Sequence, residues 1–356
     1  MKRKLSRISM VLGASGIVAA GLTAATLSSG AANAAVAHTP AWHPVLSIPG
    51  GAQSNTVETV VSTGNTSGWA FLSSSTVAYE RTGSTTWKKV AFPGRGGAVN
   101  VAAASSPSNV WAAYRSSQGK GTQLYRWNGK WTLTKAFPGA GTVNAISVLS
   151  PNDVWVFGGV GAGGQAGVFH YNGHKWTEIS STLQGGYAVS DGNVWAFSGA
   201  QVAHFNGHKW TTTNVAKLLP PATRNVPAYL TGIIALAPNS VYATGEGVTT
   251  PRGGPGVVLH FNGHTWSRVA ESGAFETVLG KSPASDGKGG LWIAGESFPS
   301  IFPQLFHYSG GKVTTASVPV GAEVNSVSRI PGTAAALAGG GQLGTANGAS
   351  VVLQYS

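Results

Sequence analysis

One short motif recurs along most of the chain, and it limits the folds available more than any other feature. Each copy has an aromatic-rich segment, a turn that contains glycine and a second segment that Trp usually opens, which predicts a β-hairpin. The clear copies are LYRWNGKWT (124–132), VFHYNGHKWT (168–177), VAHFNGHKWT (202–211) and VLHFNGHTWS (258–267), and the divergent copies are VAYERTGSTTWKKV (77–90) and LFHYSGGKVT (305–314).

A second recurring segment lies before each hairpin and sets the length of the repeat. Its aromatic residues are Trp69, Trp111, Trp155, Trp195, Tyr242 and Trp292, and the successive spacings are 42, 44, 40, 47 and 50 residues. Repeats of about 40–50 residues with four strands each are typical of propeller blades. In the third unit we expect strands at 142–149, 153–158, 168–172 and 175–180. The sequence therefore predicts an all-β protein with four-stranded antiparallel blades.

The two ends of the chain complete the last blade. The final unit has inner strands near Val324 and Ala335 and a third strand, VVLQYS, but no fourth. The segment PAWHPVLSIPG (40–50) has no hairpin partner of its own and resembles the outer strands of other units. If it supplies the missing strand, no inner edge stays unpaired. We therefore predict a seven-bladed β-propeller whose last blade is closed by the N-terminal strand.

The first 34 residues have the pattern of a secretory signal peptide. Lys2, Arg3, Lys4 and Arg7 form a basic head, an apolar stretch follows, and small residues allow cleavage after Ala34 or Ala37. We predict a single propeller domain over 38–356, exported without a membrane anchor and monomeric. The chain has no cysteine, so neither a disulfide nor a lipid-modified Cys is available to it.

The mature protein is moderately basic. The chain has 23 Lys and Arg against 11 Asp and Glu, and removal of the four basic residues of the head leaves 19 against 11, a net charge of +8. No run of basic residues is interleaved with aromatic ones, so nucleic acid is not an expected partner. Lysines near the outer strands are interpreted as a solvated rim.

Residues that follow the repeat are interpreted as scaffold. The second-strand aromatics fill the gaps between radially arranged sheets, and the Trp that opens each outer strand is a partly buried brace. Histidines recur before the hairpin aromatic and in the hairpin turn, but equivalent positions in different blades point apart and cannot meet at one ion. We therefore predict no metal site and no cofactor.

Residues that break the repeat are the candidates for binding. Long variable loops are expected on one face, between the second and third strands and between successive blades, and loops on a rigid scaffold often carry function. The chemically able side chains in these loops, predicted to bind a ligand, are Arg95, Arg115, Arg224, Tyr229, Glu246, Arg252, Glu296 and Phe298.

No catalytic motif is present. A glycoside hydrolase needs two carboxylates that flank the substrate, and acidic residues are scarce. Asp153 and Asp191 stand in turns before second strands and are interpreted as turn-forming residues. Glu246 and Glu296 are expected in adjacent blades and are the pair that such an enzyme would use. The sequence contains no G-x-S-x-G, no H-E-x-x-H and no phosphate-binding loop.

The motif S/P-N-D-V-W-x-x-G followed by H-Y/F-N-G-x-x-W resembles secreted bacterial β-propellers of the actinobacterial type, related to Kelch-like and galactose-oxidase central domains. The match spans about 40–356 and is clearest at LSPNDVWVFGG and VFHYNGHKW (149–176). It implies the propeller fold. The copper site of galactose oxidase requires a Cys–Tyr crosslink, and this chain has no cysteine.

Three functions are compatible with these features. The first is a secreted, non-enzymatic binding protein that recognises a glycan or cell-wall polymer at its loop face. The second is an extracellular carbohydrate-active enzyme, a glycosidase or lyase. The third is a protein-interaction scaffold with a surface protein as its partner. An aromatic-lined groove would favour the glycan, and a broad apolar patch would favour a protein partner.

Overall fold

The computed structural model describes residues 39–50, 56–117, 121–137, 141–161, 164–165, 167–221, 227–247, 254–272, 277–280, 283–297, 303–342 and 348–356. The predicted signal peptide lies outside the described residues. Within them, no helix has the length and apolar character needed to cross a membrane. Residues Pro40–Ser356 form one compact unit.

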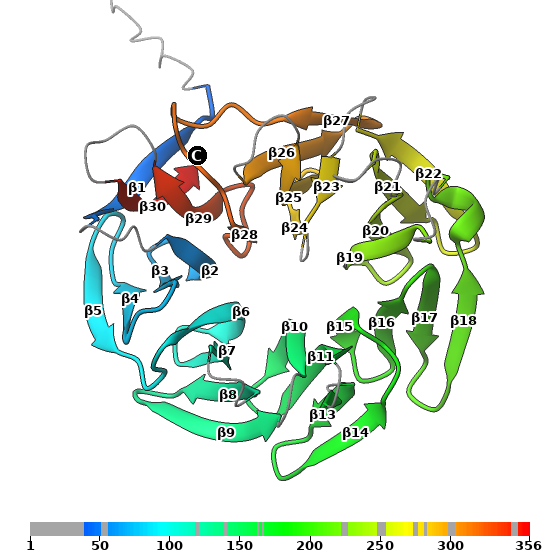
Figure 1. Cartoon of the computed structure of the whole chain (residues 1–356), viewed down its shortest axis with the longest axis horizontal. Helices are drawn as coiled ribbons and strands as arrows, with labels where there is room; N and C mark the ends of the chain where they lie inside the picture. The colour runs from blue at the N-terminus through cyan, green and yellow to red at the C-terminus, as the bar shows by residue number, and fades with distance from the viewer. Residues whose placement is uncertain are drawn as a thin grey trace, which may run out of the picture. The chain divides into compact units, whose positions relative to one another are not determined.

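Seven antiparallel sheets are arranged as blades in a ring around a central channel (Figure 1). The first strand of each blade lies nearest the channel and the last lies at the rim. The blades are β2 (Val57–Gly64), β3 (Ser67–Leu72), β4 (Val77–Arg81) and β5 (Trp87–Ala91); β6 (Gly97–Ser106), β7 (Asn109–Ser116), β8 (Thr122–Trp127) and β9 (Trp131–Phe137); β10 (Thr142–Ser150), β11 (Asp153–Gly161), β13 (Val168–Tyr171) and β14 (Trp176–Ser180), with β12 (Gly164–Gln165) beside β11; β15 (Gly185–Ser190), β16 (Asn193–Ser198), β17 (Gln201–Phe205) and β18 (Trp210–Asn214); β19 (Tyr229–Ala237), β20 (Ser240–Glu246), β21 (Gly256–Phe261) and β22 (Trp266–Glu271); β23 (Thr277–Leu279), β25 (Leu291–Ser297), β26 (Gln304–Ser309) and β27 (Lys312–Thr315), with β24 (Ala284–Ser285) beside β25; and β28 (Ser326–Arg329), β29 (Ala336–Gln342), β30 (Ala349–Tyr355) and β1 (Trp42–Pro49).

The N-terminal strand closes the ring, as predicted. β1 pairs antiparallel with β30 from Trp42 opposite Tyr355 to Pro49 opposite Ala349. The Trp42 ring packs edge-on against Trp292 of the sixth blade, with ring centroids 5.2 Å apart. On the other side of the seventh blade, Trp87 Nε1 donates a hydrogen bond to the Val45 carbonyl at 3.1 Å. β1 therefore joins its own sheet to both neighbouring blades.

The hairpin turns follow from the Asn-Gly pair of the motif. In the third blade, Asn172 Oδ1 accepts hydrogen bonds from the backbone N–H groups of His174 and Lys175, at 3.1 and 3.0 Å. Gly173 has a φ of +88°, a conformation that residues with a Cβ rarely adopt. The turns at Asn206 and Asn262 repeat this arrangement. The asparagine and glycine thus form the turn, and the histidine side chain is exposed.

The hydrophobic core lies between blades rather than within one. Trp69 and Phe71 of the first blade pack against Val110, Ala112 and the half-buried Trp131 of the second. The same arrangement recurs around the ring. Trp69, Trp111 and Trp155 are among the largest fully buried side chains, and the Trp residues that open the outer strands are half-buried. The predicted packing roles of both sets of aromatic residues are therefore confirmed.

A single substitution in β1 tests how much the closure contributes. Because Trp42 fills the space beside Trp292 and Tyr355, we expect Trp42→Ala to lower the free energy of unfolding by about 3–5 kcal/mol. The control is His43→Ala, which changes an exposed side chain on the same strand. Urea denaturation of both variants measures the difference, and equal midpoints for the two would contradict the proposed contribution of the closure.

Candidate functional site at the channel mouth

In every blade a buried aliphatic residue, in or beside the inner strand, is followed directly by a residue that lines one end of the channel. In four blades the pairing register shifts at this residue, as in a β-bulge, and leaves it without a partner on the next strand. A bulge changes the direction of one side chain within an otherwise regular strand. The residues at the four shifts are Glu58, Asn100, Asn144 and Thr231.

The other three blades place a residue in the same position. Gln184, Gly280 and Asn325 each follow a buried residue, namely Leu183, Leu279 and Val324. The backbone N–H of Gln184 donates a hydrogen bond to the carbonyl of Phe197, and that of Asn325 donates one to the carbonyl of Gly339. Six of the seven blades thus present a polar side chain at one end of the channel. We call this set the mouth ring: Glu58, Asn100, Asn144, Gln184, Thr231, Gly280 and Asn325.

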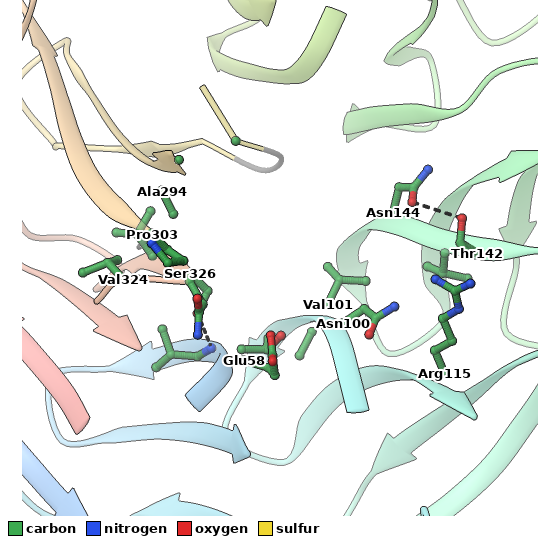
Figure 2. A pocket seen from close by; sticks show the side chains of 18 of the residues that line it. Glu58, Asn100, Val101, Arg115, Thr142, Asn144, Ala294, Pro303, Val324 and Ser326 are labelled. Atoms are coloured by element: carbon green, nitrogen blue, oxygen red, sulfur yellow. Dashed lines mark hydrogen bonds between the residues drawn. The ribbon is translucent and has the colours of Figure 1, made fainter. Parts of the chain in front are cut away.

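Two adjoining cavities occupy this end of the channel. The first has a volume of about 390 Å³ and is lined by Glu58, Asn100, Asn144 and Asn325 of the mouth ring together with Arg115 (Figure 2). The second, of about 420 Å³, is lined by Gln184, Thr231 and Asn144 and by the carboxylates described below. A third cavity is lined by aliphatic residues such as Ala102–Ala104 and by polar residues such as Ser328 and Arg329. Among the described residues that line the three cavities, the carboxylates all belong to the two cavities at the mouth.

Glu246 is the most unusual side chain of the second cavity. It is only 3% exposed, and it stands opposite Tyr229 in the register of β19 and β20. The Tyr229 hydroxyl donates a hydrogen bond to Glu246 Oε1. Glu246 Oε2 is buried and has no hydrogen-bond partner among the described residues. A carboxylate oxygen buried in this way is costly unless a donor satisfies it.

Burial and a second carboxylate shift the pKa values of Glu246 and Tyr229. Burial raises the pKa of Glu246, the hydrogen bond from Tyr229 opposes that rise in part, and the charge of Glu296 adds to it. Burial, and then the interaction with Glu246, raises the pKa of Tyr229 to about 12. Glu296 is exposed and lines both cavities. The two glutamates thus face one space from adjacent blades but differ in their environments.

The predicted binding residues are distributed unevenly. Arg115, Tyr229, Glu246 and Glu296 line the mouth cavities. Arg95 is exposed between β5 and β6 and lines none of the three cavities. The remaining predicted residues, Arg224, Arg252 and Phe298, lie outside the described residues.

The mouth ring was not predicted from the sequence, because its members follow the repeat. Glu58, Asn100, Asn144 and Asn325 each come directly after a valine in an inner strand. Residues that follow the repeat had been interpreted as scaffold. The recurring Val-Glu or Val-Asn pair was nevertheless visible, and a polar residue recurring in the middle of apolar strands is the signal that would have found it.

The recurring histidines form part of the scaffold, as predicted. His170, His204, His260 and His307 stack on the second-strand aromatic of their own blade, with ring centroids between 4.1 and 4.4 Å apart. The Nε2 atom of each lies within hydrogen-bond distance of the turn before that strand. The turn partners are Asp153, Asn193, Ser240 and Asp286, at 2.9–3.0 Å.

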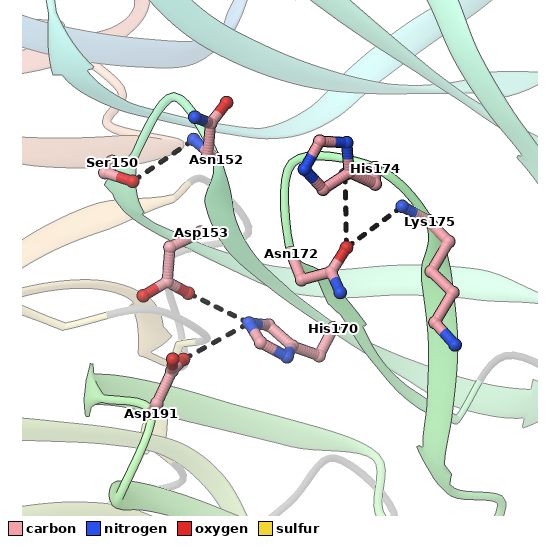
Figure 3. A network of polar contacts seen from close by, with 8 residues as sticks. All are labelled: Ser150, Asn152, Asp153, His170, Asn172, His174, Lys175 and Asp191. Atoms are coloured by element: carbon pink, nitrogen blue, oxygen red, sulfur yellow. Dashed lines mark hydrogen bonds and ion pairs between the residues drawn. The ribbon is translucent and has the colours of Figure 1, made fainter.

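The third blade departs from this pattern, because the next blade adds a second carboxylate. His170 Nε2 lies 3.0 Å from Asp153 Oδ1 and 3.2 Å from Asp191 Oδ1 (Figure 3). Each of the three side chains offers one ligand atom, and these atoms all lie within 4.8 Å of one another. Such a group of side chains can hold a divalent cation. Asp153 and Asp191 are thus more than turn-forming residues. Equivalent histidines of different blades point apart, but Asp191 stands at a non-equivalent position of the next blade and can therefore reach His170.

Asp286 provides a direct test of the histidine contacts. Burial raises the pKa of this carboxyl, but hydrogen bonds from His307 and from the N–H groups of Lys288 and Gly290 outweigh burial and hold the pKa below 3.8. A depressed pKa stabilises the fold above the ordinary pKa, and the stabilisation disappears as the pH falls through the folded-state value. We therefore expect Asp286→Ala to lose about 2–3 kcal/mol near neutral pH.

The matched control is Asp286→Asn, because Asn193 occupies the same position beside His204. Asn keeps an oxygen for the two backbone N–H groups, so we expect a smaller loss from this variant. Thermal unfolding between about pH 2 and 7 should show the wild type converging with the Asn variant at the acid end. A constant difference between the two across that range would contradict the assignment.

Comparisons with known proteins support the fold alone. The sequence matches no protein-family model and no curated protein. Among solved structures, similarity extends to YCF48 bound to a D1 peptide, with a TM-score of 0.56, 13% identity and coverage of 88% of this chain and 94% of that one. The WD40 β-propeller domain of Doa1 has a TM-score of 0.57, 12% identity and coverage of 87% and 96%.

A further structural neighbour is an enzyme. The catalytically inactive H270A virginiamycin B lyase from Staphylococcus aureus with quinupristin has a TM-score of 0.57, 10% identity and coverage of 88% of this chain and 99% of that one. The same fold thus serves binding proteins and lyases, and identities this low do not decide between them. The resemblance to Kelch-like and galactose-oxidase repeats stays a prediction.

Proposed function

We propose that this protein is a secreted, non-enzymatic binding protein that holds a glycan at the mouth of its central channel. The observation that carries the proposal is the mouth ring, which surrounds the cavities with amide, hydroxyl and carboxylate groups. Such groups both donate and accept hydrogen bonds, as the hydroxyl groups of a sugar require. A rigid ring of seven sheets supports them, so little order has to be gained on binding.

The rest of the surface favours a polar ligand over an apolar protein interface. Among the described residues, the large apolar side chains left exposed are Leu133 and Val320, in different blades. Isolated apolar residues of this kind do not form a docking patch. An aromatic-lined groove was expected of a glycan site, whereas the aromatic residues among the described lining of the two mouth cavities are Phe197 and Tyr229. Hydrogen bonding therefore dominates recognition in this proposal, and stacking is secondary.

One observation favours a glycoside hydrolase as the second candidate. Glu246 is buried with a raised pKa, whereas Glu296 faces the same cavity and is exposed. Two carboxyl groups with different environments are the arrangement that a general acid and its partner require. Glu296 contributes to the raised pKa of Glu246, so the two groups are close enough to interact.

Export is part of the proposal and rests on the N-terminal sequence. The basic head, the apolar stretch and the small residues before Ala34 and Ala37 are the features that a signal peptidase recognises. We expect N-terminal sequencing of the protein secreted by a bacterial host to begin at Ala35 or His38. Retention of Met1 in the secreted material would contradict this part of the proposal.

Substitutions at the mouth test the location of the site. A glycan array of the mature protein identifies an oligosaccharide, and titration calorimetry then measures its affinity. Asn100 and Arg115 are exposed side chains that line the first cavity. We expect Asn100→Ala and Arg115→Ala each to weaken binding by about 1–3 kcal/mol without lowering the melting temperature.

The control variants change lysines at the other end of the blades. Lys130, Lys175 and Lys209 are exposed in the hairpin turns, and their replacement by Ala should alter only the salt dependence of binding. If these variants abolish binding and the mouth variants do not, the ligand occupies the hairpin face. Release of new reducing ends from the oligosaccharide, abolished by Glu246→Gln, would instead establish the hydrolase.

A further inference from the structure

We propose that Glu246 and Glu296 form a subsite for a protonated amine, so that the preferred glycan carries free amino groups. This inference rests on the proposed function and deepens it, because it specifies one chemical group of the ligand. The first observation is the buried oxygen Glu246 Oε2, which has no hydrogen-bond partner among the described residues. Glu246 lines the second cavity, and a cation bound there would compensate the charge of this buried carboxylate.

The nature of that cation follows from the groups around it. The Tyr229 hydroxyl is committed to Glu246 Oε1, so it does not satisfy the second oxygen. Glu296 brings a second negative charge to the cavity, and the described residues that line the cavity include no Lys, Arg or His. Two carboxylates without a cation repel one another, and a cation placed between them removes that repulsion. A neutral hydroxyl would satisfy the oxygen but not the charge.

An ammonium group fits this subsite better than a guanidinium or an aromatic cation. It is compact and has three donors, which can point to different acceptors. Besides the two glutamates, Asn144 and Gln184 line the same cavity, and their amide groups are of a type that accepts hydrogen bonds. The neighbouring Arg115 lines only the first cavity, where hydroxyl groups of the same chain would be bound. The first cavity combines Glu58 and Glu296 with Arg115, so the second is the one whose carboxylates have no basic side chain beside them among the described lining residues.

The carboxylates at the channel mouth contrast with the basic character of the protein as a whole. The mature chain is basic, with only 11 acidic residues in the full sequence. Three of them, Glu58, Glu246 and Glu296, line the mouth cavities. A solvated acidic face would place its carboxylates at the rim, whereas Glu246 is buried beside the channel. A buried carboxylate beside the cavity therefore favours a cationic group of the ligand at this position.

The experiment compares three β-1,4-linked hexamers that differ at one substituent: glucosamine, N-acetylglucosamine and glucose. Calorimetry with the mature protein at low salt should give at least tenfold tighter binding of the glucosamine hexamer. We expect Glu246→Gln and Glu296→Gln each to reduce that preference at least fivefold, measured within each variant as the ratio of the affinities for the glucosamine and glucose hexamers. The control Glu178→Gln makes the same change at an exposed position on β14 and should keep the full preference.

The pH dependence gives a second measurement. The titratable groups that line the second cavity are Tyr229 on β19, Glu246 on β20 and Glu296 on β25. Because burial raises the pKa of Glu246, the preference for the amine should decline as the pH falls through this raised value. Affinity for the glucose hexamer should not follow the same profile. If Glu246→Gln fails to fold, Glu296→Gln carries the test, because it alters an exposed side chain.

The outcomes separate this inference from the proposed function. Equal binding of the three hexamers would overturn the amine subsite and leave glycan binding intact. A preference for glucosamine that survives both Gln variants would place the amine elsewhere and overturn the assignment. Binding of none of the hexamers, together with a blank glycan array, would reject the proposed function itself. A stoichiometric divalent cation lost in both Gln variants would identify a metal site in place of the amine subsite.

Discussion

The pairing of β1 with β30 is the constraint on which the rest of the molecule depends. Seven wedge-shaped sheets can surround a channel only if the last sheet also contacts the first. Here one sheet contains strands from both ends of the chain, so the ring cannot open without breaking backbone hydrogen bonds. The large tryptophans then fix the spacing between blades, because they fill the gaps that widen toward the rim. The closure of the ring and the packing between blades therefore determine both the stability of the protein and the diameter of the channel.

The channel mouth follows from that closure through the geometry of the inner strands. An inner strand must bury an aliphatic side chain between blades and still accommodate the narrow space near the axis. The register shift after Val57, Val99 and Val143 meets both conditions, because it releases one residue from the ladder. The shift occurs at the same place in the first three blades and in the fifth. The other three blades have a residue at the equivalent place, so the seven residues form a ring. The mouth ring is thus a consequence of the scaffold and not an addition to it.

This coupling explains which parts of the molecule were predictable. The blades, their number and the closure follow from the period of the aromatic residues and from the resemblance of 40–50 to the outer strands. The mouth ring was not predicted, because members such as Glu58 recur with the repeat, and residues that follow the repeat were interpreted as scaffold. The contact of His170 with Asp191 was also missed, because it joins non-equivalent positions of neighbouring blades.

Glu246 shows how a repeat protein acquires a single site from equivalent parts. At this level the second and third blades have Arg115 and Gly159. The fifth and sixth blades have Glu246 opposite Tyr229 and Glu296 opposite Val278. A carboxylate buried in this position costs stability unless the ligand or a proton satisfies it. The scaffold tolerates that cost because its packing lies between the blades, away from the channel. A propeller can therefore place a destabilising charge beside its axis, and the proposed amine subsite would use the asymmetry that Glu246 and Glu296 bring to the channel mouth.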